Sequence, residues 1–163
     1  MSETSPVLPD SVRRVEMAAM SLGLPIRILQ TQTTARSAEE AAASVGAEVG
    51  QIVKSLVFQG RESERAYLLL VSGANRVDEA RVAAEVGEAV RRPDAAFVRA
   101  ATGFAIGGVS PLGAAEGLPI LADPALLDFE IVWAAAGTPF HVFEVDPRRL
   151  IDVLGAKIVA LAA

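Results

Sequence analysis

The sequence predicts an α+β fold in which short helices flank a mixed β-sheet. Capped helical segments of two or three turns are mixed with apolar strand-like segments, without the strict strand–helix alternation of an α/β protein. Two pairs of these strands are separated by short turns that are typical of hairpins. With 163 residues, 52% of them hydrophobic, the chain can bury one sizeable core. We therefore expect a single domain over residues 1–163.

The helices are predicted from the residues that cap them. Ser37 and Glu40 match a capping box, and Asp78 and Asp146 are suitable N-caps. Glycines follow several of these segments and are expected to end them. The predicted helices cover residues 10–22, 37–44, 79–86 and 146–154, with a helical turn over residues 123–127.

The strands are predicted from short apolar runs bounded by turn residues. They cover residues 26–30, 52–59, 66–72, 96–99, 130–135, 140–145 and 157–161, and residues 119–122 form a further short apolar run. The turn at residues 60–65 makes a hairpin of the second and third strands. A second hairpin turns at residues 137–139, which read Gly-Thr-Pro.

Composition excludes several kinds of chemistry. Cysteine is absent and His141 is the only histidine, which excludes disulfides, thiolate nucleophiles and His-rich metal sites. No sequence motif for a serine hydrolase, a P-loop or a zinc peptidase occurs. We therefore expect neither a metal nor an organic cofactor, and any chemistry must use lysine, hydroxyls, carboxylates, backbone groups or the substrate itself.

Charge and hydropathy limit the partners. The net charge of −5 argues against non-specific nucleic-acid binding, so DNA is not an expected partner. No apolar run reaches the ~18 residues that a membrane span needs, and Met1–Asp10 is polar with two prolines. We expect a soluble cytoplasmic protein with no membrane partner and a flexible segment over residues 1–9.

Two segments together suggest a ligand pocket. In a strand over residues 52–59, Lys54 falls on the same face as Leu56 and Phe58, where an ammonium group is costly unless it reaches water or an anion. The segment Gly103–Gly113 contains two adjacent glycines and a proline, as a backbone that closely approaches a ligand requires. Such a pocket would hold an anionic or carbonyl-bearing group.

Three stretches carry a resemblance to a known family. They are residues 37–42 leading to residues 51–58, residues 107–113, and residues 136–139 followed by a strand and residues 146–150. In these stretches the chain resembles the YbaK/EbsC family, the free-standing relatives of the editing insertion domain of bacterial prolyl-tRNA synthetase. The similarity covers roughly residues 26–161. It implies an α+β domain whose mixed sheet is partly barrel-like.

The resemblance also implies a function, which is hydrolysis of an amino acid from a mischarged tRNA after the synthetase has released it. The implied catalytic residues are Lys54, which would bind oxygens near the terminal adenosine, and the loop glycines Gly107 and Gly108, whose amides would bind the scissile carbonyl. A hydroxyl of the terminal ribose would help to activate water. The implied substrate-binding residues are Ser55, Ile106, Val109, Ser110, Pro111 and His141.

The implied partners are the aminoacylated 3′ end of tRNA, with tRNA for proline expected, and prolyl-tRNA synthetase as a further candidate. Ile106 and Val109 suit a small apolar side chain, such as that of alanine or 2-aminobutyrate. A cluster of arginines offers either a solvated surface or a contact patch for the acceptor stem: Arg76, Arg81, Arg91, Arg92 and Arg99. Two alternatives to the enzyme are a non-catalytic module that binds aminoacyl-adenosine or RNA, and a subunit that works only when bound to a synthetase.

Overall fold

The structure, a computed structural model, describes residues 8–33 and 37–163. The predicted flexible segment 1–9 therefore lies, up to residue 7, outside the described residues. The α-helices are α1 (Asp10–Ser21), α2 (Ala38–Val45), α3 (Glu79–Val86), α4 (Ala95–Thr102) and α5 (Pro147–Leu154), and two 3₁₀ helices are η1 (Val49–Gln51) and η2 (Pro124–Asp128). The strands are β1 (Arg27–Gln30), β2 (Val53–Gly60), β3 (Ala66–Ser72), β4 (Val90–Arg91), β5 (Ile120–Ala122), β6 (Val132–Ala135), β7 (His141–Val145) and β8 (Lys157–Ile158).

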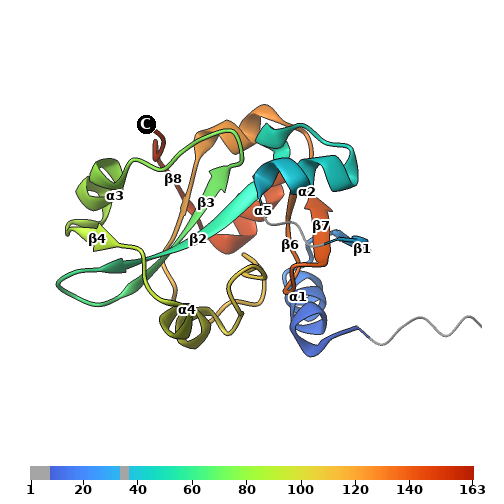
Figure 1. Ribbon diagram of the computed structural model, residues 1–163, viewed down its shortest axis with the longest axis horizontal. Coiled ribbons are helices and arrows are strands. Elements are labelled where there is room, and N and C mark those ends of the chain that lie inside the picture. The colour runs from blue at the N-terminus through green and yellow to red at the C-terminus, as the bar shows by residue number, and fades with distance from the viewer. Residues whose placement is uncertain (1–7, 34–36) are drawn as a thin grey trace, which may run out of the picture.

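The predicted α+β fold is confirmed, but the strands form two sheets. The larger sheet has the order β4-β2-β3-β5-β8 and is mixed, because β2 pairs antiparallel with β3 and β4 whereas β5 pairs parallel with β3 and β8. The smaller sheet, β1-β7-β6, is antiparallel. A parallel bridge between Ile52 and Trp133 joins the two sheets, and neither sheet closes into a barrel. In Figure 1, α3 and β4 lie at one end of the molecule, and α1, β1 and β7 at the other.

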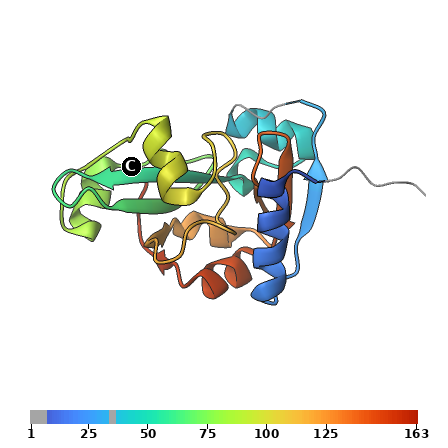
Figure 2. The same cartoon turned by 90° about the horizontal axis from the view of Figure 1, so that it is seen from below.

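The main core lies between the two sheets and the helices that cover them. It contains side chains from both sheets together with Val15 of α1, Phe104, and Leu150 of α5, which are buried. Figure 2 shows α1 running beside β7. Because one cluster draws on segments from residue 15 to residue 151, the packing of distant segments fixes the positions of the loops between them.

The strand predicted over residues 96–99 is wrong, since this segment lies in helix α4. Asp94 is its N-cap and accepts a hydrogen bond from the Phe97 amide at 2.8 Å. Val98 and Thr102 are one turn apart and are both buried, which is the helical spacing rather than the strand spacing. The short strand β4, which the sequence analysis missed, precedes this helix and pairs with the end of β2.

The tip of the β2–β3 hairpin is held by the Glu88 carboxylate. This group accepts hydrogen bonds from the amides of Glu62 and Ser63, both at 2.9 Å, and from the hydroxyls of Ser63 and Tyr67 at 2.5 and 2.8 Å. A Cβ atom at Gly60 would lie 2.3 Å from this carboxylate, so only glycine leaves room for it. These hydrogen bonds lower the pKa of Glu88 to about 2.

Within the described residues, no helix is both long and apolar enough to cross a membrane.

Candidate functional site

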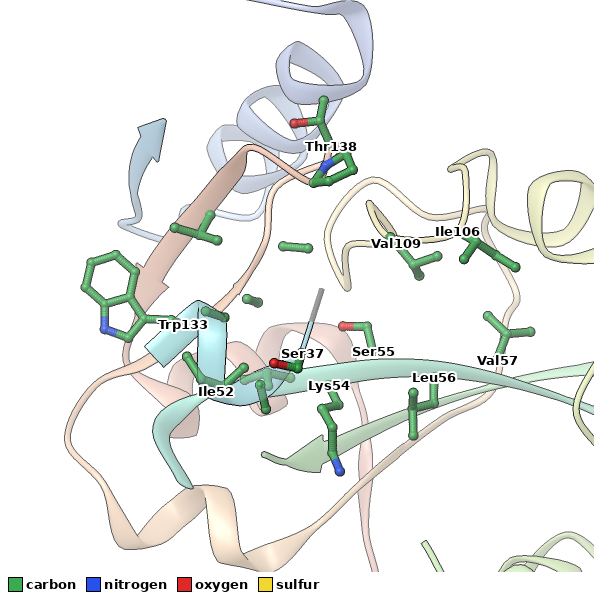
Figure 3. Close-up of a pocket in the computed structure, with 18 of the residues that line it drawn as sticks. Ser37, Ile52, Lys54, Ser55, Leu56, Val57, Ile106, Val109, Trp133 and Thr138 are labelled. Carbon is green, nitrogen blue, oxygen red and sulfur yellow. The ribbon is translucent and has the colours of Figure 1, made fainter. Parts of the chain in front are cut away.

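A cavity of about 350 Å³ opens between β2, α2, the β6–β7 hairpin and the segment Gly103–Gly113, here called the glycine loop (Figure 3). Six of the nine residues predicted for the site line it: Lys54, Ser55, Ile106, Gly107, Val109 and His141. Gly108, Ser110 and Pro111 belong to the same loop but do not line the cavity. The fold therefore brings together segments that are about ninety residues apart in the sequence.

Neighbouring residues of β2 point to opposite sides of the strand. Ser55 points into the space between β2 and the loop that carries Val109, whereas Lys54 and Leu56 point to the other side (Figure 3). This alternation follows from the period of two in a β-strand. Lys54 thus contributes to the wall of the cavity while its ammonium nitrogen is directed away from the centre.

The Lys54 ammonium is held by a short polar network. Lys54 Nζ donates a hydrogen bond to the backbone carbonyl of Asn75. The side-chain amide of Asn75 donates in turn to Asp123 Oδ2 at 2.9 Å, and this carboxylate also accepts from the Ser72 amide at 3.1 Å. Asp123 is only 2% exposed, so the turn that holds Lys54 is fixed by a buried group.

Burial lowers the pKa of Lys54 below its ordinary value. Nearby Arg76 and Arg92 lower it further, while Glu39 and Asp123 raise it. An ammonium group that uses one of its three donors on Asn75 retains two for a ligand. The two nearby arginines and the two nearby carboxylates offset each other, so it is the charge of Lys54 itself that would favour an anion, such as a phosphate, as that ligand.

The Ser55 hydroxyl is buried and unpaired. Its Oγ atom is shielded from solvent and makes no hydrogen bond to any described residue. Buried hydroxyls nearly always have a partner, because an unsatisfied one costs about 1–3 kcal/mol. Since Ser55 lines the cavity, a ligand or a water molecule in the cavity is the expected partner.

Gly107 and Gly108 have different surroundings. Gly107 lines the cavity with φ of +93°, and its amide makes no hydrogen bond to a described residue. The Gly108 amide donates to the carbonyl of Ala105 at 3.0 Å. A Cβ atom at Gly108 would lie 2.7 Å from the carbonyl oxygen of Gly137, so this glycine permits backbone-to-backbone packing against the β6–β7 turn.

Ser110 and Pro111 lie inside the loop. Ser110 is fully buried, and its hydroxyl accepts a hydrogen bond from the Leu112 amide at 3.2 Å. Both residues thus shape the glycine loop from within.

His141 lies at the start of β7 and is 6% exposed. Its Nδ1 shares a hydrogen bond of 2.7 Å with the hydroxyl of Thr138, which also accepts from the Phe140 amide at 3.0 Å. Burial lowers the pKa of His141, so its imidazole is neutral at pH 7. A neutral ring offers one donor and one acceptor, and one of its two nitrogens is already used by Thr138.

The apolar wall of the cavity, under α2 and its neighbours, was not among the residues predicted for the site. These lining residues are Ala38, Ala41, Val45, Ile52, Trp133 and Val142. The amphipathic spacing of α2 was available in the sequence as a signal, but such spacing indicates only a core face. Arg92, Thr138 and Pro139 also line the cavity, and Arg92 is the one member of the predicted arginine cluster that does so.

The arginines of that cluster have varied surroundings. Arg81 pairs with Asp78 at 3.5 Å, and Arg91 donates to Gln59 at 3.3 Å. The guanidinium of Arg92 lies 5.1 Å from the ring centroid of Phe58, beside the cavity.

Among the described residues, no group of three or more histidine, aspartate or glutamate side chains is arranged to hold a metal ion.

Comparisons with known proteins agree on one family. The family model of the aminoacyl-tRNA editing domain matches residues 32–153. The uncharacterized protein YwhH of Bacillus subtilis (strain 168) is 28% identical over 131 residues, which cover 80% of this chain and 83% of that protein. The proline–tRNA ligase of Limosilactobacillus fermentum is 33% identical over 96 residues, which cover 56% of this chain and only 17% of the ligase.

A solved structure gives the same result. It is described provisionally as a trans-editing enzyme for prolyl-tRNA synthetase, and it is 45% identical to this chain. The TM-score is 0.89, and the match covers 96% of this chain and 99% of that chain.

Proposed function

Because the chain belongs to the aminoacyl-tRNA editing domain family, we propose that it is a hydrolase that removes a wrongly attached amino acid from tRNA after release from the synthetase. The proposed substrate is tRNA for proline that carries a small amino acid such as alanine or 2-aminobutyrate. The reaction would take place in the cytoplasm, and prolyl-tRNA synthetase is the proposed partner.

One observation carries this proposal. The cavity combines an apolar wall with a small set of polar groups that come from three separate segments, namely Ser55 of β2, Gly107 of the glycine loop and His141 of β7. An apolar cavity with a small number of convergent polar groups is typical of sites that bind a small ligand group in one orientation. The match to the editing-domain family supports an aminoacyl ester as that group.

In the proposed reaction, as the family resemblance implies, no protein group acts as the nucleophile: the chain has no cysteine, and the Ser55 hydroxyl has no partner base among the described residues. The Thr138 hydroxyl, which shares a hydrogen bond with His141, is proposed to orient the imidazole. Water attacks the ester carbonyl, aided by a hydroxyl of the terminal ribose. The Gly107 amide, which has no partner among the described residues, would donate to the oxygen on which negative charge develops. The bond between the carbonyl carbon and the ribose oxygen then breaks, and that oxygen takes up the proton lost by water.

The amino acid side chain would contact Ile106, Val109 and the apolar wall under α2. An apolar pocket of this kind discriminates weakly, because one methylene group is worth only about 1–3 kcal/mol. We therefore expect a graded preference among small side chains. Charged side chains would be rejected, since their desolvation would be uncompensated.

The test is a panel of tRNA for proline charged with alanine, 2-aminobutyrate, serine, cysteine, threonine or proline, each incubated with the purified protein. Release of alanine or 2-aminobutyrate should be the fastest, and release of proline much slower. Fastest release of proline would contradict the proposed selectivity. No release of any amino acid, with binding of aminoacyl-tRNA retained, would favour a non-catalytic binding module, and release only after addition of the synthetase would favour a subunit.

A further inference from the structure

Helix α1 lies outside the residues that match the family model, which begin at residue 32, and it does not line the cavity. It nevertheless contacts both segments that form the cavity's upper wall, the glycine loop and the β6–β7 turn. If helix α1 served only to cover the core, apolar contacts would be enough. Those of α1 also include polar contacts made by one exposed residue, Arg14.

Arg14 contacts the first residues of the glycine loop in two ways. Its Nη2 atom donates a hydrogen bond of 2.6 Å to the carbonyl of Gly103. Its guanidinium carbon lies 4.2 Å from the ring centroid of Phe104, a residue that is 1% exposed. A charge-assisted hydrogen bond and a cation–π contact made by the same planar group restrict both the backbone and the side chain at this end of the loop.

Arg14 also contacts the other end of the glycine loop. A Cβ atom at Gly113 would lie 3.2 Å from both Cγ and the backbone oxygen of Arg14. A Cβ atom at Gly103 would lie 3.2 Å from the guanidinium nitrogens. Gly103 and Gly113 both have positive φ, which lets the chain turn tightly at each contact. One residue of α1 therefore packs against the two ends of an eleven-residue segment at once.

The start of α1 contacts the second cavity segment. A Cβ atom at Gly137 would lie 2.6 Å from the backbone oxygen of Ser11, and one at Gly108 would lie 2.7 Å from the backbone oxygen of Gly137. The backbone of α1, the β6–β7 turn and the middle of the glycine loop are thus stacked in direct contact. This stack fixes the position of Gly107 relative to Thr138 and His141, which line the same cavity.

From these contacts we infer that Arg14 is a positioning residue for the glycine loop. It touches no part of the cavity, and it acts by holding Gly103, Phe104 and Gly113 so that the Gly107 amide stays aimed at the substrate carbonyl. Its effect on catalysis rests on the proposed function, whereas its effect on the loop does not. A misplacement of about 1 Å in a group that orients the reacting carbonyl is enough to slow a reaction by about a hundredfold.

The experiment compares Arg14→Ala with Arg13→Ala. Arg13 is the neighbouring residue with the same charge, and its side chain is 58% exposed and only 4.0 Å from Asp10, within its own helix. In Arg14→Ala we expect kcat for release of alanine to fall by about ten- to a hundredfold, with a smaller change in KM for the tRNA. Amide hydrogen exchange should become faster across residues 103–113 and stay unchanged in α3, which lies at the opposite end of the molecule from α1 (Figure 1). Arg13→Ala should match the wild type in both measurements.

Wild-type kcat together with wild-type exchange in Arg14→Ala would overturn the inference, and so would equal effects in the two variants. If the wild type releases no amino acid, the proposed function fails and the exchange measurement alone decides the role of Arg14. If Arg14→Ala does not fold, Arg14→Gln takes its place, because it retains an N–H donor and lacks the cation. The amide exchange rate at residues 103–113 in Arg14→Gln should then lie between the rate in the wild type and the rate in an unfolded loop. An exchange rate equal to that of the wild type would contradict the inference.

Discussion

The two polar clusters at opposite ends of strand β2 differ in how completely their hydrogen-bonding groups are paired. At the hairpin tip, the Glu88 carboxylate accepts four hydrogen bonds from Glu62, Ser63 and Tyr67. At the cavity end, the Ser55 hydroxyl and the Gly107 amide have no partner among the described residues. Paired groups stabilise a fold, whereas unpaired buried groups cost stability and are retained where a ligand pairs them. The comparison thus separates a structural cluster from a candidate site on one strand.

The largest expected effect comes from Lys54→Ala. Loss of a charge-assisted contact with the substrate should cost about 1.5–3 kcal/mol, which slows deacylation by roughly ten- to a hundredfold. Lys157→Ala is the matched control, because Lys157 is the only other lysine and its exposed side chain pairs with Glu85 far from the cavity lining. The measurement is the rate of amino-acid release, with thermal unfolding recorded for both variants. A wild-type rate in Lys54→Ala would make this residue a structural lysine.

Gly108→Ala should have the next largest effect. The backbone at Gly108 does not need positive φ, so the added methyl group acts only through its clash with the carbonyl of Gly137. Separation of the glycine loop from the β6–β7 turn should slow release by about tenfold. Gly50→Ala is the control, since its methyl group would also crowd a neighbour, the Phe129 ring, but this residue does not line the cavity. Similar rates for the two variants would argue against a role for loop placement.

Ser55→Ala tests the unpaired hydroxyl directly. We expect deacylation to slow by about two- to tenfold, the value of one neutral hydrogen bond. The free energy of unfolding should rise by about 1 kcal/mol, because an unsatisfied buried hydroxyl is removed. Ser110→Ala is the contrasting variant, since its buried hydroxyl is paired with the Leu112 amide and its loss should destabilise the fold by about 1 kcal/mol. Destabilisation by both substitutions would show that Ser55 is also paired in solution.

Glu88→Gln should leave deacylation unchanged and alter only the pH dependence of stability. The pKa of Glu88 is about 2 in the folded protein, below its ordinary value of 4.5, so the folded state binds fewer protons between these values. The stabilisation is complete above pH 4.5 and is lost as the pH falls toward 2. Thermal unfolding at pH 7 and pH 3 should therefore show a smaller acid-induced loss in Glu88→Gln than in the wild type. An equal loss in both proteins would assign acid sensitivity to other groups.

Local signals in the sequence determined much of this structure. The Ser37 hydroxyl accepts from the Glu40 amide at the start of α2, as the capping box predicts, and Asp78 and Asp146 cap α3 and α5. Strands β2 and β3 pair as an antiparallel hairpin, with the strands and the turn that the sequence predicts. These features depend on residues that are a few positions apart, so the local sequence is enough to predict them. That Lys54 and the glycine loop share one pocket was suggested by the residues of the two segments and by the family resemblance.

Only the tertiary structure decided how the cavity is built. The alternation of β2 was predictable, but which side faces the cavity depends on where α2 and the β6–β7 hairpin pack, and this side proved to be that of Ser55 rather than that of the Lys54 ammonium. The difference between Gly107 and Gly108 arises from Gly137, about thirty residues away. Likewise, nothing near Arg14 in the sequence indicates contact with Gly103 and Gly113. The physical reason is that such contacts join segments whose separation is set by packing of the whole core, which no local pattern encodes.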